Sequence, residues 1–253
     1  MKELWNSFTI AIAMYSKIPI KPSNWEKNNM KYVMCFFPIV GVFVGIGMLL
    51  WAYLGDLLSF GSAFQTVGYV LIPILITGGI HLDGLLDTAD ALSSYQPMER
   101  KLEILKDSHA GAFAIIVLGC YLLGAYGIWS EVSTDMLMVL SIGYILSRAL
   151  SGYSIVTFQC AKNSGLAAMF SDAASKKIVK NVMICEILMA SITMLGINLQ
   201  YGVFGILGAL CVFLYYKRMS MKQFGGITGD LAGFFLQVCE LIMALFIVIG
   251  VKV

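Results

Sequence analysis

The feature that most constrains this chain is a series of apolar runs, each about 20 residues long, which is the length a helix needs to cross a bilayer. Such runs predict seven membrane helices, at 32–54, 63–80, 112–130, 136–157, 178–197, 201–216 and 233–251. A further short helix, 4–15, amphipathic or re-entrant, is predicted before the first span, and the segment with Pro19 and Pro22 ends it. The fold class is therefore all-α, a polytopic membrane bundle.

Composition supports a lipid environment. The chain has 253 residues, of which 59% are hydrophobic and 13% are charged, whereas soluble domains carry about a quarter charged residues. The net charge of +2 comes from scattered basic residues, which excludes a nucleic-acid surface. Because no polar linker interrupts the chain, residues 1–253 are predicted to form a single integral membrane domain with the lipid bilayer as partner.

Basic residues predict the orientation. They occur before the first span and in every second connection, whereas the other connections contain none. The four groups are Lys2, Lys17, Lys21, Lys27 and Lys31; Arg100, Lys101 and Lys106; Lys162, Lys176, Lys177 and Lys180; and Lys217, Arg218 and Lys222. By the positive-inside rule, the N-terminus is cytoplasmic and the C-terminus is outside the cell membrane. Nearly every polar motif lies at the cytoplasmic helix ends, so the active site is expected on that face.

An aspartate cluster follows the second span. Asp83, Asp87 and Asp90 are spaced i, i+4 and i+7, so on a helix they project from one stripe. Like charges in that arrangement repel, and a bound cation such as Mg²⁺, which prefers hard oxygen ligands, would compensate them. The alternative is a solvated acidic loop.

The next segment, 101–111, carries further candidates. Lys106, Ser108 and His109 can donate to phosphate oxygens, and Asp107 can ligate a metal or accept a proton. A helix cap with snorkelling lysines is the alternative interpretation. His81 is the only other histidine of the chain, and we interpret both histidines as contacts rather than catalysts.

Two glycine-containing segments, 161–166 and 224–230, are predicted on the same face. Glycine backbone can approach a ligand closely and direct N–H groups at an anion, which makes Lys162, Asn163, Gly226 and Thr228 candidate contacts. Two flexible turns are the alternative, and Asp230 is equally a candidate N-cap.

Three charged residues lie deep inside predicted spans. Arg148, Glu186 and Glu240 are costly at membrane depth and are expected to face a polar cavity or one another. Arg148 is interpreted either as a substrate contact or as the partner of one of the glutamates.

Taken in order, these motifs resemble the cobalamin synthase family, the adenosylcobinamide-GDP ribazoletransferases. The resemblance rests on segments 81–90, 105–113, 161–166 and 224–230, with Glu240 beyond them, and on 17–20 and 36–41 near the N-terminus. Two positions depart from the family pattern: Ala91 stands where glycine is usual, and Lys162 where arginine is frequent. Lys162 would bind phosphate as a point charge rather than as a bidentate fork.

The resemblance implies a reaction in which α-ribazole, or its 5′-phosphate, attacks adenosylcobinamide-GDP and expels GMP. It implies that Asp83, Asp87 and Asp90 hold Mg²⁺ on the pyrophosphate, and that Asp107 and Asp230 complete the metal shell or deprotonate the nucleophile. The two phosphate-binding lysines would be Lys106 and Lys162, and the cavity would be shaped by Arg148 and Glu240. The partners are thus a corrinoid nucleotide and a ribazole.

Two other functions compete with this one. A CDP-alcohol phosphotransferase also clusters aspartates at a membrane helix end, but Asp87-Thr88 stands where that family has Ala-Arg. A cation-coupled transporter would place its acids near the midplane at broken helices, which Glu186 and Glu240 alone favour. Small residues in several spans permit close helix contacts within a chain or between the chains of a homo-oligomer.

Overall fold

The structure is a computed structural model that describes residues 2–107, 109–162 and 164–252. Within these residues the chain forms twelve helices and no strand beyond one isolated β-bridge, so the prediction of an all-α fold is confirmed. The helices are α1 (Lys2–Tyr15), α2 (Lys27–Met30), α3 (Val33–Leu57), α4 (Ser62–Thr77), α5 (Ile80–Ser93), α6 (Met98–Ile104), α7 (Ala112–Trp129), α8 (Thr134–Thr157), α9 (Leu166–Ala173), α10 (Lys176–Ile197), α11 (Leu199–Phe224) and α12 (Gly229–Gly250).

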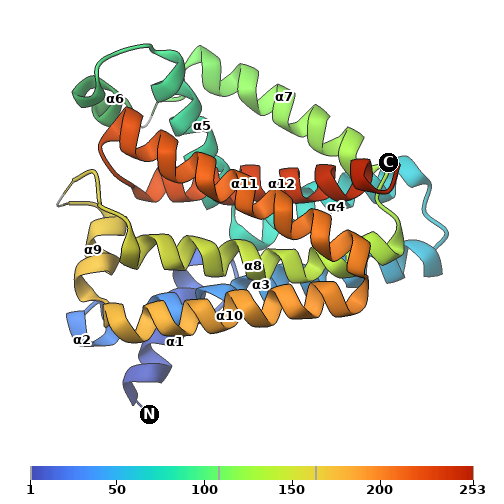
Figure 1. The fold of residues 1–253 in the computed structure, drawn as a ribbon, viewed down its shortest axis with the longest axis horizontal. Helices are drawn as coiled ribbons and strands as arrows, with labels where there is room; N and C mark the ends of the chain where they lie inside the picture. The colour runs from blue at the N-terminus through green and yellow to red at the C-terminus, as the bar shows by residue number, and fades with distance from the viewer. Residues whose placement is uncertain (1, 108, 163, 253) are drawn as a thin grey trace.

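The long helices form the membrane part of the bundle. Over the described residues, six helices are long and apolar enough to cross a membrane: α3, α7, α8, α10, α11 and α12. A seventh crossing requires α4 and α5 together, which are bent by 96° relative to each other. Figure 1 shows most of the long helices running lengthwise, with α7 inclined to them. The chain is a multi-pass membrane protein, as predicted.

The second predicted span, 63–80, ends earlier than expected. Helix α4 has 16 residues, which at 1.5 Å per residue is about 24 Å, less than the roughly 30 Å of a hydrocarbon core. It ends at Gly78 and Gly79, whose φ angles of 67° and 80° lie in the left-handed region that favours glycine. The Lys17 backbone N–H donates to the carbonyl of Ile76 at 2.8 Å, which ties the segment after α1 to this break.

The sixth predicted span, 201–216, was too short. Helix α11 continues to Phe224. The apolar run stops earlier because the last turns of the helix are amphipathic. Lys217, Arg218 and Lys222 are exposed there, while Met219 and Phe224 are buried. The charges therefore end the apolar run but not the helix.

Glycines allow the central helices to pack closely. A Cβ at Gly45 of α3 would lie 2.7 Å from the carbonyl oxygen of Ser141 on α8, and one at Gly41 would overlap the carbonyl of Tyr144. Such a Gly-x-x-x-Gly spacing brings two backbones together without a side chain between them. The close contacts that the small residues permit are thus formed within one chain.

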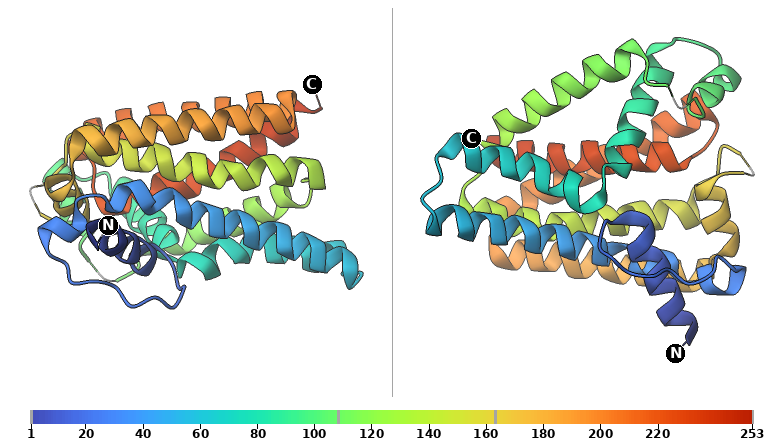
Figure 2. Two further views of the ribbon diagram at one scale, coloured as in Figure 1. Left: turned by 90° about the horizontal axis from the view of Figure 1, so that it is seen from below. Right: turned by 180° about the vertical axis from the view of Figure 1, so that it is seen from behind.

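One end of the bundle gathers the polar segments. Figure 1 shows α2, α6, α9 and the connection from α11 to α12 at this end, and the α3–α4, α7–α8 and α10–α11 connections with the C-terminus at the other. Helix α1 lies across the polar half of the bundle (Figure 2). The connections rich in lysine and arginine therefore share one face, and we call it the polar face.

Candidate active site

The three predicted aspartates lie on one helix. Asp83, Asp87 and Asp90 all belong to α5, so their spacing places them along one stripe, as the sequence predicted. Asp83 is exposed, and Asp87 and Asp90 are half-buried.

Close packing of α5 on α12 brings a fourth carboxylate to this stripe. A Cβ at Gly84 would lie 2.6 Å from the backbone oxygen of Asp230, and one at Gly233 would lie 3.1 Å from the carbonyl oxygen of His81. With hydrogen at both positions the two helices touch. Asp83 and Asp230 consequently line the same cavity.

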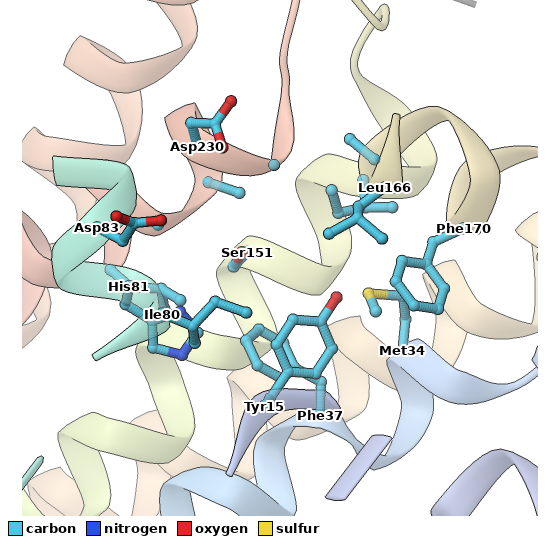
Figure 3. A pocket seen from close by; sticks show the side chains of 16 residues that line it. Tyr15, Met34, Phe37, Ile80, His81, Asp83, Ser151, Leu166, Phe170 and Asp230 are labelled. Carbon is cyan, nitrogen blue, oxygen red and sulfur yellow. The ribbon is translucent and has the colours of Figure 1, made fainter. Parts of the chain in front are cut away.

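This cavity has a volume of about 250 Å³ and is mostly apolar. Figure 3 shows Asp230 at its top, Asp83 and His81 on one side, and Phe170 and Met34 on the other. The rings of Tyr15 and Phe37 form its floor in that view. We call it the aromatic cavity.

A second cavity, of about 180 Å³, adjoins the first, because Leu166, Ala167, Gly229 and Asp230 line both. Lys106 and Lys162 lie in its wall, and we call it the lysine cavity. The Lys162 ammonium donates to the carbonyl oxygen of Leu102 at 3.0 Å. Loss of hydration and the positive charge of Lys106 lower the pKa of Lys162. Two lysines that repel each other in one cavity wall favour an anion between them.

Asp90 has a structural role in addition to any role at a metal. Its two carboxylate oxygens accept hydrogen bonds from the backbone N–H groups of Gly111, at 2.6 Å, and Ala114, at 2.9 Å. Gly111 precedes α7 and Ala114 lies in its first turn, where backbone N–H groups have no acceptor within the helix. Asp90 thus caps α7 from α5.

The carboxylates do not form a complete metal site by themselves. In the part of the chain that the structure describes, no three His, Cys, Asp or Glu side chains converge at metal-binding distance. The Mg²⁺ site therefore stays a prediction. A pair of carboxylates beside an anion cavity fits this cation, which usually takes one or two carboxylates together with substrate phosphates and water.

Asp107 and His109 lie on the exposed part of the polar face. The ring Nδ1 of His109 is 2.7 Å from Asp107 Oδ1, and the His109 backbone N–H donates to the same oxygen. These hydrogen bonds lower the pKa of Asp107 below its usual value. Neither residue lines the aromatic or the lysine cavity. The predicted contacts Ser108 and Asn163 lie outside the described residues.

The two glycine-containing segments bind each other. The Ile227 backbone N–H donates to the Gln159 carbonyl at 2.8 Å, and the Ala161 N–H donates to the Ile227 carbonyl at 2.9 Å. A Cβ at Gly226 would lie 2.5 Å from the Ala161 nitrogen, so only glycine allows the two backbone segments to approach this closely. The segments are a paired structure rather than separate turns.

The N-cap of α12 differs from the sequence-based alternative. The hydroxyl of Thr228 accepts from the Leu231 N–H at 3.2 Å, so Thr228 is the cap. Asp230 is the second residue of the helix, and its carboxylate is left facing both cavities.

Arg148 and Glu240 form a buried ion pair between α8 and α12. Glu240 also accepts a 3.0 Å hydrogen bond from the hydroxyl of Ser147, and the two charged residues are 0% and 8% exposed. Neither lines the aromatic or the lysine cavity. Glu186 lies elsewhere, on α10 in a groove against α3 and α8.

Sequence reasoning missed most of the aromatic wall. Tyr15, Phe37 and Phe170 come from α1, α3 and α9, and each is embedded in an apolar segment where no local pattern distinguishes it. It also missed Lys101, which is buried and donates to Gln223 Oε1 at 2.6 Å.

The fold and this site are those of a multi-pass membrane enzyme. The chain belongs to the cobalamin-5-phosphate synthase family, whose model matches residues 7–248. The resemblance found in the sequence motifs is thereby confirmed, and the match supports neither the CDP-alcohol phosphotransferase nor the transporter.

Relatives cover nearly the whole chain. An adenosylcobinamide-GDP ribazoletransferase of Lachnoclostridium phytofermentans is 46% identical over 245 residues, which is 97% of this chain and 94% of the relative. The ribazoletransferase of Clostridium botulinum is 33% identical over 247 residues, 96% of each chain. That of Clostridium perfringens is 30% identical over 242 residues, 95% of this chain and 96% of the relative. No solved structure matches the chain significantly.

Proposed function

We propose that this chain is an adenosylcobinamide-GDP ribazoletransferase that joins α-ribazole, or its 5′-phosphate, to adenosylcobinamide-GDP. The products are GMP and adenosylcobalamin, or adenosylcobalamin 5′-phosphate. Family membership supports the reaction. The structural observation that carries it is the position of Asp230 where the aromatic cavity meets the lysine cavity, with Asp83 in the wall of the aromatic cavity.

In the proposed reaction, the oxygen of a free ribose hydroxyl of the ribazole forms a bond to the phosphorus on the cobinamide side of the pyrophosphate, so that a 5′-phosphate, where the ribazole carries one, is retained in the product. The bond from that phosphorus to the bridging oxygen breaks, and GMP leaves with the electron pair. With either acceptor, the proton of the attacking hydroxyl passes to a carboxylate. Asp230 is the residue we assign to this proton, because it faces both cavities.

The lysines hold the phosphate oxygens in this proposal. Lys106 and Lys162 neutralise the charge that develops on the leaving GMP, and phosphoryl transfer depends mainly on such positioning and neutralisation. Asp83 and Asp87 would hold Mg²⁺, which when bound supplies further positive charge at the pyrophosphate. Asp90 can join them only while it also caps α7.

We further propose that the polar face is cytoplasmic and that the membrane is the cell membrane. The lysine-rich and arginine-rich connections gather at the end that carries the two cavities (Figure 1), which supports this orientation by the positive-inside rule. Both substrates would then reach the site from the cytoplasm.

One assay tests the function. Membranes containing the protein are incubated with adenosylcobinamide-GDP, α-ribazole and Mg²⁺, and GMP and the corrinoid products are separated by chromatography. We expect GMP to form in equal amount to a corrinoid that carries the new lower ligand. Membranes with Asp230→Asn are the control and should form neither. Consumption of CDP-diacylglycerol without any corrinoid product would show that the proposal is wrong.

A further inference from the structure

The aromatic cavity is built from flat side chains. The rings of Tyr15 and Phe37 have centroids 4.4 Å apart, and Tyr15 stacks beside His81 at 6.2 Å with an interplanar angle of 27°. Phe170 extends this cluster, with its centroid 6.1 Å from that of Tyr15. Figure 3 shows these rings around one space, contributed by α1, α3, α5 and α9. Such walls suit a flat, apolar ligand.

One polar atom in the wall lacks a partner. His81 is 3% exposed, and among the described residues its ring Nε2 has no hydrogen-bond partner. A buried polar nitrogen left in this state costs free energy, and a ligand that hydrogen-bonds to it recovers that cost. A neutral imidazole with its proton on Nε2 donates to an acceptor nitrogen or oxygen.

The volume of the cavity restricts what can enter. At about 250 Å³, it lies below the roughly 300 Å³ at which pockets for drug-sized ligands begin. A two-ring heterocycle fits such a space, whereas a corrin macrocycle is far too large for it. The guanine and adenine of adenosylcobinamide-GDP are also two-ring heterocycles, but their edges carry several polar groups that this mostly apolar wall would leave without partners, whereas the ribazole base has a single free ring nitrogen.

The position of the cavity fixes the direction of such a ligand. The aromatic cavity meets the lysine cavity at Gly229 and Asp230. A nucleoside with its base among the aromatic rings would therefore have its sugar at Asp230, and a ribose hydroxyl would face the lysine cavity. This order matches a reaction between a nucleoside and a pyrophosphate.

We propose that the aromatic cavity is the acceptor subsite and binds the planar base of the ribazole against the rings of Tyr15, Phe37 and Phe170. The His81 Nε2–H donates to the base nitrogen that does not carry the ribose. This inference rests on the proposed ribazoletransferase function and adds the place and orientation of the acceptor.

The first test separates the two substrates kinetically. Phe170→Leu and His81→Leu should each raise the KM for α-ribazole about tenfold or more. Stacking on an aromatic ring and a buried hydrogen bond each contribute about a tenfold factor in the affinity for the base. The KM for adenosylcobinamide-GDP should stay within about twofold. His81→Gln, which keeps a donor, should recover part of the loss. Phe204→Leu is the matched control, because Phe204 packs against Gly250 at the other end of the bundle.

The second test does not need turnover. Free 5,6-dimethylbenzimidazole, which is the base of α-ribazole, should bind the purified protein in detergent. Phe170→Leu and His81→Leu should raise the Kd for this base by the same factor as they raise the KM for α-ribazole. An active transferase in which neither variant changes the KM for α-ribazole, or in which both substrates are affected equally, overturns the inference. An inactive protein that still binds the base, with weaker binding in both variants, instead refutes the proposed function and supports the subsite.

Discussion

Asp90 on α5 accepts a 2.6 Å hydrogen bond from the backbone N–H of Gly111, the residue that precedes α7. A second bond reaches the first turn of the helix at Ala114. A residue predicted to ligate a metal thus also fixes how α7 enters the bundle. The two roles make different demands on the side chain, and they can be separated by substitution.

Asp90→Asn and Asp90→Ala distinguish capping from metal binding. Asparagine keeps one acceptor oxygen, for one of the two backbone N–H groups, whereas alanine removes both bonds and should cost about 1–3 kcal/mol of stability. If capping dominates, the Asn variant should lose less of the melting temperature in detergent and less of the activity than the Ala variant. Equal loss of activity in both variants, with unchanged melting temperatures, would assign Asp90 to the metal instead.

Asp87→Asn should abolish turnover and weaken the dependence on Mg²⁺ without loss of membrane insertion. Asp87 lies on the same stripe as Asp83 but accepts none of the capping bonds, so its carboxylate is free to act at the metal. We expect a loss larger than the roughly 10- to 100-fold that removal of an outer-shell partner causes. The measurement is the initial rate of GMP release across a Mg²⁺ titration.

The control for that variant is Asp135→Asn. Asp135 is exposed in the first turn of α8, at the opposite end of the bundle, so its loss should leave the titration unchanged. An Asp87→Asn enzyme with near-normal activity would remove Asp87 from the metal site.

Gly84→Ala should separate α5 from α12. Its Cβ would lie 2.6 Å from the backbone oxygen of Asp230, which cannot rotate away, and such overpacking typically costs about 1–3 kcal/mol. We expect a lower melting temperature and at least tenfold lower activity. Gly119→Ala is the control, because nothing lies within 4 Å of a Cβ at that position of α7. Full activity in Gly84→Ala would show that the close packing does not position the carboxylates.

The parts of this site that could be predicted from the sequence are those set by local structure. The stripe of Asp83, Asp87 and Asp90 follows from helical periodicity alone, and the positions of the spans follow from apolar length. The break after Thr77 could not be predicted in this way, because the apolar run continues through Gly78 and Gly79.

The aromatic cavity could not be predicted, for a different reason. In a soluble protein a buried aromatic differs from its surroundings by facing away from water. Here Tyr15, Phe37 and Phe170 lie in helices whose other faces meet apolar lipid or apolar neighbours, so the pattern of hydrophobic residues does not show which ring faces inward. The contact of Asp83 with the cavity of Asp230 likewise depends on α5 packing against α12.

Arg148→Met should strongly destabilise the protein, because it leaves the Glu240 carboxylate buried without its partner. Breaking one side of a buried pair typically costs about 3–5 kcal/mol, whereas replacing both partners by apolar residues is often neutral. We therefore expect the double variant Arg148→Met, Glu240→Leu to recover most of the melting temperature. Glu186→Gln is the control, since it removes a half-buried carboxylate without leaving an arginine unpaired. A double variant as unstable as the single one would mean that Arg148 and Glu240 also stabilise the protein through contacts other than the one with each other.

Lys162→Met should raise the KM for adenosylcobinamide-GDP while leaving the KM for α-ribazole nearly unchanged. The pKa of Lys162 is lowered by loss of hydration and by Lys106, so an incoming phosphate relieves the repulsion between the two ammonium groups. A charge-assisted hydrogen bond contributes about 1.5–3 kcal/mol, which corresponds to a KM increase of roughly tenfold or more. Lys162→Arg keeps the charge and should lose less. Lys177→Met, which removes an exposed lysine at the start of α10 on the same face, should have no effect.

Since Phe170→Leu is expected to change only the KM for α-ribazole, the double variant with Lys162→Met should show the two increases independently, each on its own substrate. A Lys162→Met enzyme that loses affinity for α-ribazole instead would place the acceptor, and not the pyrophosphate, in the lysine cavity.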